Sequence, residues 1–459
     1  MREISIKKAA DYMRGSVKGD ENLVVSAVST DTRKISGGEL FFALKGENSD
    51  GHRYLWTAFE KGAGAAVISD EECLPEGSTA VKVEDTLRGL QLLAKGCLSE
   101  RDDLIRIGVT GSTGKTSTKE LLYASMKGKY RTARNMGNFN NHIGMPLTAL
   151  SVEDEHQAAI FEMGMGGFGE VELLADIGRP DIGIITNIGV SHISDLGSRE
   201  NILKAKLEIT AFFDERSVLV VNYDNDLLSA YSWEKETYRV VKVGSSQDCD
   251  YIIRAVRDLS EDGVELDLEI KGKIFTFEIP VPGAHNGHNG ALAVAAAVEA
   301  GVAPDLIAQT IKTCEHTDKR LIIKTSPGGI KVIDDSYNAS PDSMKSGIDV
   351  LMSVKGERKI LFLADMLGMG AETEKYHREV GEYAGLCGVD GVFTVGKDAA
   401  FISDQAAKHI GKEKVGHFET LDDLLKEIDG LVKPGDAVLV KASRALGMEK
   451  TAEYLLENR

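Results

Sequence analysis

Residues 104–119 constrain the fold of this chain more than any other segment. Their sequence, LIRIGVTGSTGKTSTK, predicts a short apolar β-strand, a turn with two glycines, and a helix that begins near Lys115. Gly111 and Gly114 lack a Cβ, so this turn can bend tightly and direct its N–H groups inward, into the space that the positive end of the helix dipole also faces. The pattern predicts a phosphate-binding loop made of Thr110, Gly111, Ser112, Thr113, Gly114, Lys115 and Thr116.

Two side chains of this loop have specific expected roles. The Lys115 ammonium would reach the terminal phosphates of a triphosphate, and the Thr116 hydroxyl would ligate Mg²⁺. The strict P-loop pattern requires glycine at position 109, where this chain has Val109, so the formal match fails by one residue. The alternative interpretation is a glycine- and threonine-rich turn that enters a structural helix. The strand–turn–helix order and the Gly-Lys-Thr triplet favour phosphate binding.

The length and charge of the chain limit the classes of protein it belongs to. With 459 residues, it is long enough for about three domains at ~150 residues each. The net charge of −18 argues against nucleic acid or an anionic membrane as the main partner. Five cysteines without metal-ligand spacing, and an N-terminus without a signal-peptide pattern, indicate a protein of the reducing cytoplasm.

The order of apolar runs predicts the α/β fold class with three domains, because predicted strands alternate with helices along the chain. We expect a small N-terminal α/β domain, a central domain with a P-loop ATPase-type parallel sheet, and a C-terminal Rossmann-like α/β domain. Residues 250–280 predict a meander of short strands, because residues 263–270 alternate apolar and polar side chains and a Lys-Gly-Lys turn follows. The predicted domains cover residues 1–100, 101–318 and 319–459.

Small polar residues gather in two loops outside the phosphate loop. Between the first two predicted strands, small hydroxyl groups and one arginine form either an anion site or an ordinary polar turn; they are Ser29, Thr30, Asp31, Thr32 and Arg33. Further along, four asparagines occur within seven residues: Asn135, Asn138, Asn140 and Asn141. Asparagines cap helices, and they also contact phosphates and sugars without adding charge, which is the function we expect here.

In the central domain, ionisable groups follow predicted strands. Glu162 ends one strand, and His192 comes shortly after another. Ligands of doubly wound sheets collect at the carboxyl ends of strands, so these two side chains and Thr116 could converge on Mg²⁺. Taken alone, His192 is more often a helix-cap or core histidine. By residue type alone, Lys206 on the helix predicted over 201–212 is a solvated lysine.

Polar groups also mark the start of one helix and the strand ends of the third domain. His285, Asn286, His288 and Asn289 occupy the first turns of an alanine-rich helix, where amides suit a nucleobase edge. A cap-only role explains one asparagine but not four such groups in five residues. In the third domain, polar residues cluster after the predicted strands, namely Asp334, Asp335, Asp365, Lys441, Ser443 and Arg444.

Taken together, these motifs resemble the Mur ligase superfamily over nearly the whole chain. The TGSTGKT loop with a non-glycine before its threonine is the usual form in that family, which explains Val109. Glu162 in EMG, His192 in TNIGVSHI and Asn286 in AHNGHN match the central-domain motifs in order and spacing. This resemblance implies an ATP-dependent ligase that forms an amide bond.

Three segments are similar to the superfamily members that add D-alanyl-D-alanine (D-Ala-D-Ala) to UDP-N-acetylmuramoyl-tripeptide in peptidoglycan precursor synthesis. They are DDSYNASPDSM (334–344), GNFNNHIGMPLT (137–148) and STDTRKISGGELFFALKGENSDGH (29–52). The resemblance implies these two molecules as substrates, an acyl-phosphate intermediate, and ATP and Mg²⁺ as cofactors. One segment departs from the family pattern, which is Gly-Asp-Met followed by Glu-Leu-Gly. In this chain, residues 364–370 read ADMLGMG.

The resemblance also implies a role for individual residues. Lys115, Lys206 and His192 would be catalytic, and Lys206 matches the family's carbamylated lysine. Mg²⁺ would be bound by Thr116, Glu162, His192 and the Lys206 carbamate. Besides the phosphate loop, ATP would contact Asn286, Asn289, Arg320, Asp335, Tyr337 and Asn338. The UDP-substrate would contact residues 29–33 together with Lys45, Gly46, Asn138, Asn140 and Asn141.

Two other interpretations remain open at this stage. The chain could be a sibling Mur ligase or a ligase similar to folylpolyglutamate synthase, which would differ in the amine it accepts. It could also be a nucleotide-dependent switch, which would hydrolyse ATP without an acceptor amine. The polar strand ends in all three domains favour a substrate held between domains, and we expect a monomer that contacts no nucleic acid and inserts into no membrane.

Overall fold

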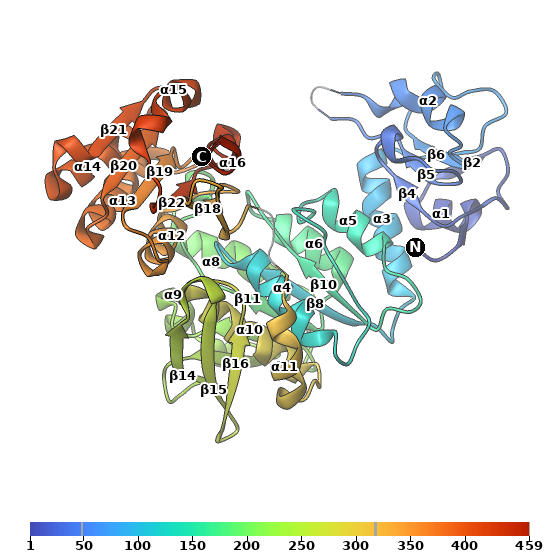
Figure 1. Ribbon diagram of the computed structural model, residues 1–459. Helices are drawn as coiled ribbons and strands as arrows, with labels where there is room; N and C mark the ends of the chain where they lie inside the picture. Colours follow the sequence, from blue (N-terminus) through green and yellow to red (C-terminus); the bar gives the residue numbers. More distant parts are fainter. Residues whose placement is uncertain (47–48, 316–318, 459) are drawn as a thin grey trace.

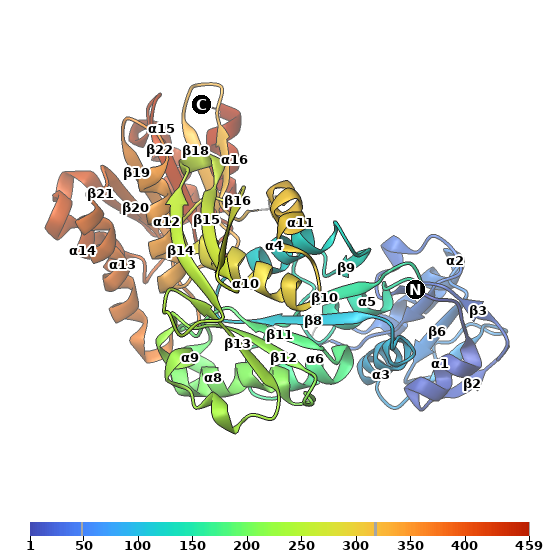
Figure 2. The same ribbon diagram turned by 90° about the horizontal axis from the view of Figure 1, so that it is seen from below.

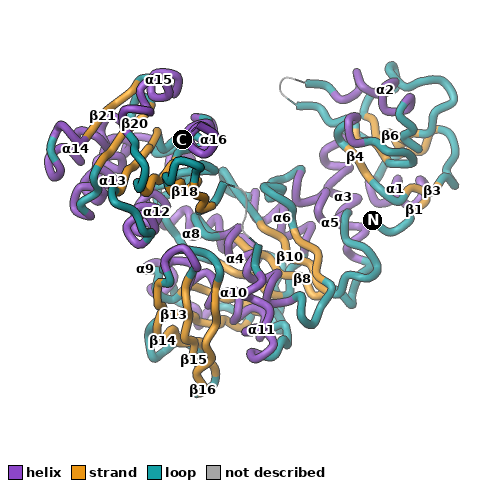
Figure 3. The backbone as a smooth tube through the Cα atoms, viewed as in Figure 1, coloured by secondary structure: helices purple, strands orange, loops and turns teal. Residues whose placement is uncertain are grey.

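The computed structural model describes residues 1–46, 49–315 and 319–458, and shows three α/β units that follow one another along the chain (Figures 1 and 3). The central unit lies between the N-terminal and C-terminal units in Figure 1. The predicted fold class is therefore confirmed. The boundary predicted at residue 100 stays a prediction, and the one at residue 318 and the end at residue 459 lie outside the described residues. No described helix has the length and apolar character needed to span a membrane.

The N-terminal unit contains a five-stranded sheet in the order β2-β7-β6-β5-β4 and a separate antiparallel pair of β1 with β3. Its strands are β1 (Ile4–Ser5), β2 (Ser16–Lys18), β3 (Val24–Val25), β4 (Val28–Ser29), β5 (Leu40–Phe42), β6 (Ala65–Ile68) and β7 (Ala80–Lys82). Its helices are α1 (Ile6–Met13), α2 (Leu55–Glu60) and α3 (Thr86–Ser99). The strands from β4 to β7 are parallel, and β2 joins the edge in the antiparallel sense.

The central unit contains a nine-stranded sheet in the order β16-β15-β14-β13-β12-β11-β8-β10-β9. Its strands are β8 (Ile105–Thr110), β9 (Thr132–Arg134), β10 (Ala158–Glu162), β11 (Ile182–Ile185), β12 (Val218–Asn222), β13 (Arg239–Gly244), β14 (Tyr251–Asp258), β15 (Val264–Ile270) and β16 (Lys273–Ile279). The strands from β9 to β14 pair in parallel, whereas β14, β15 and β16 form the predicted antiparallel meander.

Helices cover both faces of this central sheet, as expected for a parallel sheet with buried strands. They are α4 (Lys115–Met126), α5 (Gly144–Leu150), α6 (Glu170–Gly178), α7 (Ile193–Leu196), α8 (Arg199–Leu207), α9 (Asp226–Ala230), α10 (His285–Glu299) and α11 (Pro304–Thr310). Figure 2 shows α4 and α10 on one face, and α6 and α8 on the other. The alanines of α10 are fully buried and let this helix approach the sheet closely.

The C-terminal unit contains a six-stranded sheet in the order β17-β18-β22-β19-β20-β21. Its strands are β17 (Ile322–Thr325), β18 (Lys331–Asp335), β19 (Lys359–Ala364), β20 (Gly391–Val395), β21 (Val415–Phe418) and β22 (Ala437–Lys441). Its helices are α12 (Pro341–Ser353), α13 (Thr373–Cys387), α14 (Ala400–Ile410), α15 (Leu421–Leu431) and α16 (Glu449–Asn458). All pairs are parallel except β17 with β18.

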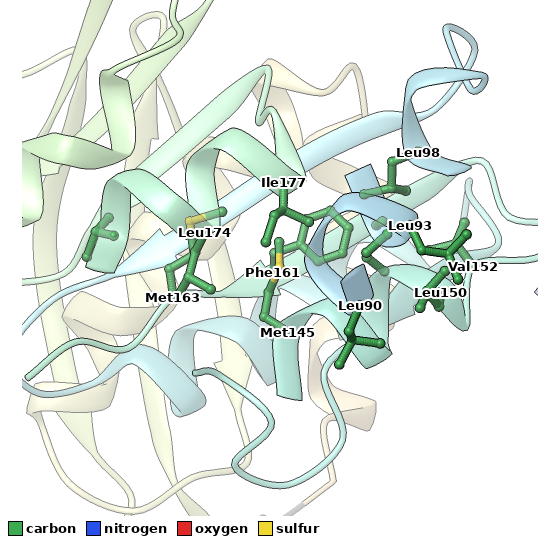
Figure 4. Close-up of a cluster of buried hydrophobic side chains, with 14 of the residues drawn as sticks. Leu90, Leu93, Leu98, Met145, Leu150, Val152, Phe161, Met163, Leu174 and Ile177 are labelled. Atoms are coloured by element: carbon green, nitrogen blue, oxygen red, sulfur yellow. The ribbon is translucent and has the colours of Figure 1, made fainter. Parts of the chain in front are cut away.

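The N-terminal and central units share one hydrophobic core (Figure 4). Leu90, Leu93 and Leu98 of α3 pack in the same cluster as Met145 of α5 and Phe161 of β10. By contrast, the two large clusters of the C-terminal unit contain only residues of that unit. Helix α3 therefore joins the first two units into one packed body, while the third unit has cores of its own.

The register of the central sheet brings three strand ends together. Glu162 at the end of β10 is the partner of Val109 on β8, and Ile185 of β11 is the partner of Thr110. The loops that follow β8, β10 and β11 consequently leave the sheet at the same edge. This edge holds the phosphate loop and the side chains predicted to act with it.

Candidate active site

The phosphate loop has the conformation that its glycines predict. Gly111 has φ +149° and Gly114 has φ +79°, and Gly114 is the residue that precedes the first turn of α4. A Cβ on Gly111 would stand 1.8 Å from Oγ1 of Thr186. Only glycine fits this position, because the loop lies directly against the residue that follows β11.

Side chains from the end of β11 hold the loop in place. The N–H of Thr113 donates to Oδ1 of Asn187 at 2.9 Å, and Nδ2 of Asn187 donates to Oγ1 of Thr113 at 2.6 Å. Oγ1 of Thr186 donates to the carbonyl of Thr113 at 2.5 Å. On the other side, the N–H of Gly189 donates to Oγ of Ser112 at 2.9 Å. These bonds fix the loop before any ligand is bound.

A cavity of about 620 Å³ lies between the central and C-terminal units and includes this loop. Central residues that line it include Ser112, Thr113, Gly114, Lys115, Thr116, Asn140, Asn141, Glu162, His192 and Asn289. C-terminal residues that line it include Arg320, Asp335, Tyr337, Asn338 and Lys441. The structure thus brings together most of the residues predicted to bind ATP and metal.

Lys115 lies at the start of α4 and folds back over the loop. Its Nζ donates to the carbonyls of Gly111 at 2.7 Å and Ser112 at 3.3 Å. Burial lowers the pKa of Lys115 to about 8; the carboxylate of Glu162 opposes this shift and the charge of Arg320 adds to it. A lysine bonded only to neutral carbonyls is available to an incoming anion.

Glu162 is buried, with 1% of its side chain exposed, and only one of its carboxylate oxygens is hydrogen-bonded. Oε1 accepts from Oγ1 of Thr116 at 3.1 Å and from Nδ2 of Asn140 at 2.7 Å. Oε2 has no hydrogen-bond partner in the part of the chain that the structure describes. An unbonded buried carboxylate oxygen next to a threonine hydroxyl fits the oxygen ligands that Mg²⁺ prefers.

Few side chains near Glu162 can ligate a metal, and this suits the coordination chemistry of Mg²⁺. Within residues 1–46, 49–315 and 319–458, no three His, Cys, Asp or Glu side chains are grouped as a metal site. Mg²⁺ usually keeps several waters and binds through one or two carboxylates together with substrate phosphates. The residues present therefore fit Mg²⁺ that arrives with a nucleotide.

His192 lines the cavity from the turn before α7. Its backbone has φ +66°, a conformation that is uncommon for residues other than glycine. Burial lowers the pKa of His192, and the charges of Lys115 and Lys206 lower it further. A neutral imidazole is the form that ligates a metal.

Lys206 is buried on α8, with only 1% of the residue exposed, and does not line the cavity. Across the described residues, its ammonium forms no hydrogen bond or ion pair. Burial holds the pKa of Lys206 well below its ordinary value, and the charge of Lys115 lowers it further. This burial excludes the alternative of a solvated lysine, and a neutral amine is what carbamylation requires.

The two asparagines at the start of α10 occupy different environments. Asn289 lines the cavity, whereas Asn286 is fully buried and donates to the carbonyl of Pro282 at 2.7 Å. Nδ2 of Asn289 donates to Oδ1 of Asn286 at 2.9 Å. His285 is also at the cavity, and burial lowers its pKa to about 4. Asn289 can meet a ligand directly, while Asn286 holds Asn289.

The C-terminal unit contributes a charged group and an aromatic group. Nζ of Lys441 is 2.5 Å from Oδ2 of Asp335 and donates to the carbonyl of Asn338 at 3.0 Å. The guanidinium of Arg320 lies 4.1 Å from the centre of the Tyr337 ring, and that of Arg444 lies 5.2 Å from it. These side chains place cations and a flat ring opposite the phosphate loop.

The residues predicted to bind the UDP end lie on the N-terminal unit, away from this cavity. Asp31 caps a short turn, and its hydrogen bonds from Arg33 hold the pKa of Asp31 at about 2. Arg33 remains largely exposed, and Lys61 donates to the carbonyl of Thr32. Of the described residues that line the cavity, none is from the first hundred, so Ser29, Thr30, Lys45 and Gly46 lie outside it. Asn138 does not line it either, whereas Asn140 and Asn141 do.

Sequence reasoning missed Lys119, and it expected Asn135 to contact phosphates or sugars, whereas Asn135 is fully buried and holds Glu162. Lys119 lies one turn after Lys115 on α4, is fully buried, and has its Nζ 3.6 Å from Oε2 of Glu162. Oδ1 of Asn135 accepts from the N–H of Glu162 at 2.6 Å. The spacing of Lys115 and Lys119 places both on one face of α4, but it does not indicate that Lys119 is buried against Glu162.

Three segments of the chain match descriptions of Mur ligase domains. Residues 24–96 match the description "Mur ligase family, catalytic domain", and residues 109–297 match "Mur ligase middle domain". Residues 319–444 match "Mur ligase, glutamate ligase domain". The three matches correspond to the three units of the structure.

Relatives and solved structures match the chain over nearly its whole length. The UDP-N-acetylmuramoyl-tripeptide–D-alanyl-D-alanine ligase of Bacillus subtilis (strain 168) is 41% identical and covers 99% of this chain and 98% of its own. The ligase of the same name from Escherichia coli (strain K12) is 30% identical, covering 100% and 99%. The crystal structure of MurF from Acinetobacter baumannii has TM-score 0.90 at 25% identity, covering 99% of each chain.

A structure with nucleotide is also similar. MurF ligase from Thermotoga maritima in complex with ADP has TM-score 0.79 at 26% identity, and it covers 94% of this chain and 97% of its own. Because the relatives match over the full length and each unit matches a domain of one family, the chain belongs to the Mur ligase family.

Proposed function

We propose that this protein is an ATP-dependent ligase that joins D-Ala-D-Ala to UDP-N-acetylmuramoyl-tripeptide in peptidoglycan precursor synthesis. The names of relatives up to 41% identical support this activity. The observation that carries the proposal is the phosphate loop with Lys115 and Glu162, which line one cavity between the central and C-terminal units. One carboxylate oxygen of Glu162 in this cavity has no hydrogen bond among the described residues. The similar MurF ligase structure from Thermotoga maritima, with TM-score 0.79, is a complex with ADP, and this supports the use of ATP.

In the proposed arrangement, the N–H groups of the phosphate loop and Nζ of Lys115 bind the β- and γ-phosphates. Lys115 has only neutral carbonyls as partners in the free protein, so it can exchange them for phosphate oxygens. Asn289 contacts the adenine edge and is fixed by the buried Asn286. Tyr337 and Arg320 approach the nucleotide from the C-terminal unit.

The first chemical step activates the tripeptide. A carboxylate is a poor acylating agent, so its oxygen attacks the γ-phosphorus, ADP leaves, and an acyl phosphate forms. Lys115 lies where the charge of the transferred phosphoryl group is spread. The UDP end of this substrate is held by residues 29–33, Lys45 and Gly46 of the N-terminal unit, which α3 fixes to the central unit.

The second step forms the amide bond. The amine of D-Ala-D-Ala attacks the acyl carbonyl carbon, inorganic phosphate leaves with the bonding electron pair, and the amine nitrogen releases a proton. The C-terminal unit forms one wall of the cavity, where it excludes the water that would otherwise hydrolyse the acyl phosphate. ATP, carboxylate and amine are thus converted to amide, ADP and phosphate.

The residues present fit Mg²⁺, and they would hold it as follows. Thr116, Oε2 of Glu162, His192 and, once carbamylated, Lys206 would be the protein ligands. Mg²⁺ bound there would neutralise phosphate charge and polarise the phosphoryl group. Lys206 has the buried, unpaired amine that captures CO₂ with loss of a proton to give a carbamate.

Free cysteines support a location in the reducing cytoplasm. The five cysteines are all unpaired, and both substrates proposed here are soluble metabolites. We propose the cytoplasm as the place of action and a monomer as the working form. Light scattering of the purified protein would test the second statement.

The test of the proposed function is a product assay. The protein is incubated with ATP, Mg²⁺, D-Ala-D-Ala and a UDP-N-acetylmuramoyl-tripeptide that carries either diaminopimelate or lysine. We expect phosphate release that needs both substrates, and a product whose mass equals their sum less one water. The Lys115→Ala variant should form no product while keeping its circular dichroism spectrum.

Other results would replace the proposal. Phosphate release stimulated by a free amino acid in place of the dipeptide would identify a different ligase of the family. Steady ATP hydrolysis without any amine would favour a nucleotide-dependent switch. Near-normal turnover by Lys115→Ala would show that the site is assigned to the wrong loop.

A further inference from the structure

Lys119 is a fully buried lysine that the proposed mechanism does not use. Its Nζ donates to the carbonyl of Asn135 at 2.8 Å and lies 3.0 Å from Oε1 of Glu120. The third group around it is Oε2 of Glu162, at 3.6 Å. A buried ammonium is costly unless it is paired, so this position is maintained by a specific set of oxygen partners.

Asn135 links Lys119 to the backbone of Glu162. While its carbonyl accepts from Lys119, its Oδ1 accepts from the N–H of Glu162 at 2.6 Å. Its Nδ2 donates to the carbonyl of Phe139 and lies 3.4 Å from the carbonyl of Glu162. Lys119 therefore acts on Glu162 in two ways, directly at the carboxylate and through Asn135 at the main chain.

The carboxylate of Glu162 is held on both sides by this arrangement. Oε1 accepts from Thr116 and Asn140, while Oε2 has Lys119 within ion-pair distance but no hydrogen bond. The ionic contact orients the carboxylate without using the lone pairs of Oε2 in a hydrogen bond. Oε2 stays the acceptor that a cation can take.

We propose that Lys119 is a positioning residue that orients Glu162 for the metal of the metal–nucleotide complex. This inference rests on the proposed function and deepens it, because it assigns a role to a residue outside the cavity lining. Groups behind a metal ligand typically change metal affinity or activity by roughly 10- to 100-fold when they are removed.

The positive charge of Lys119 would repel a metal at Glu162 if it were not compensated. Glu120 lies 3.0 Å from Nζ of Lys119 and compensates its charge, and Glu120 is itself paired with Arg134 at 2.7 Å. The effect of Lys119 on metal binding that remains is that it orients the carboxylate of Glu162. We therefore expect removal of Lys119 to weaken the metal-dependent part of nucleotide binding.

The experiment measures ADP binding by calorimetry, once with Mg²⁺ and once with EDTA. In Lys119→Met, which keeps the length and the apolar stem, we expect the gain in affinity given by Mg²⁺ to fall by roughly 10- to 100-fold. Affinity in EDTA should match that of the unchanged protein. The control is Lys127→Met, an exposed lysine that follows the same helix and should change neither value.

A double-mutant cycle separates this role from a structural one. If Lys119 acts through Glu162, then Lys119→Met should have no further effect on the Mg²⁺ dependence in a Glu162→Gln background. Equal losses in both backgrounds, an unchanged Mg²⁺ dependence, or a stronger one in Lys119→Met would overturn the inference.

A second variant covers the case in which Lys119→Met does not fold, and ADP binding by the unchanged protein tests the proposed function. If Lys119→Met fails to fold, Lys119→Gln keeps a donor for the carbonyl of Asn135 but removes the charge beside Oε2 of Glu162, and the same loss of Mg²⁺ dependence is expected. No such loss in Lys119→Gln would then overturn the inference. Absence of ADP binding by the unchanged protein would instead refute the proposed function.

Discussion

The side-chain oxygen of Asn289 lies 2.5 Å from the position that a Cβ on Gly114 would occupy. Gly114 lies in the phosphate loop directly before the first turn of α4, with φ +79°, and Asn289 belongs to the second turn of α10. Asn289 is held in turn by Asn286, which is bonded to the carbonyl of Pro282. The loop and α10 are therefore fitted so closely that no side chain can be added between them.

Gly114→Ala should abolish nucleotide binding while the protein still folds. Alanine at this φ is strained by about 1–2 kcal/mol, and its Cβ would also displace Asn289 from the cavity. Calorimetric titration with ATP would measure the loss. The matched control is Gly77→Ala, which has φ +77° with no atom within 4 Å of the added Cβ. It should show the strain in thermal unfolding but unchanged ATP affinity, and equal effects of the two variants would refute the steric argument.

Lys115→Met should make the ligand-free protein more stable at neutral pH, although it removes a residue needed for ATP. Burial holds the pKa of Lys115 at about 8, below its ordinary value of 10.5, so its charge is unfavourable in the folded state. Below about pH 8, Lys115 is protonated in both the folded and the unfolded protein, so the full free-energy cost of burying its charge is present. Between pH 8 and 10.5 the unfolded chain binds more protons, so the stability of the unchanged protein rises with pH.

The advantage of the Lys115→Met variant should therefore shrink by about 2 kcal/mol between about pH 7 and 9.5, since each pKa unit corresponds to about 1.4 kcal/mol. Urea unfolding of both proteins across this pH range measures the difference. Lys127→Met, at an exposed position beyond the same helix, should show no such trend. A constant difference at all pH values would mean that the Lys115 amine titrates normally.

Lys206 should carry a carbamate in the active protein. Its buried amine has no partner among the described residues, and its pKa lies well below the ordinary value. Carbon NMR with ¹³C-labelled bicarbonate should show a carbamate signal that is absent in Lys206→Met and kept in Lys204→Met, whose lysine is exposed on the same helix. Activity of Lys206→Ala should be lost and partly restored by a small carboxylate. Full activity without rescue would disprove the carbamate.

Much of the site was predictable because it depends on backbone periodicity. The loop at 110–116 and Glu162 follow strands whose apolar character is plain in the sequence, and parallel strands bring their carboxyl ends together. The environments of Lys119 and Asn286 were not predictable in this way. Their roles depend on which way a side chain points from a helix, and composition places lysine and asparagine at the surface.

Parts of the fold were missed for similar reasons. No strand was predicted at β12 or β13, whose apolar runs are short. In the structure β12 pairs with β11 and β13, and β13 pairs with β12 and β14. The edge strands β9 and β21 are three and four residues long and lack a clear alternation. Pairing with a neighbour, which the sequence alone does not display, decides such segments.

The core that α3 shares with the central unit gives the last prediction. Leu93 is fully buried in the cluster that also contains Met145 and Phe161 (Figure 4). Leu93→Ala should cost about 2–5 kcal/mol, as buried leucine truncations do. Because this core spans both units, we expect their unfolding to shift together in calorimetry, while the transition of the C-terminal unit stays in place. Leu361→Ala, in the core of the C-terminal unit, should show the reverse. A Leu93→Ala variant that loosens only the N-terminal unit would show that the two units fold independently.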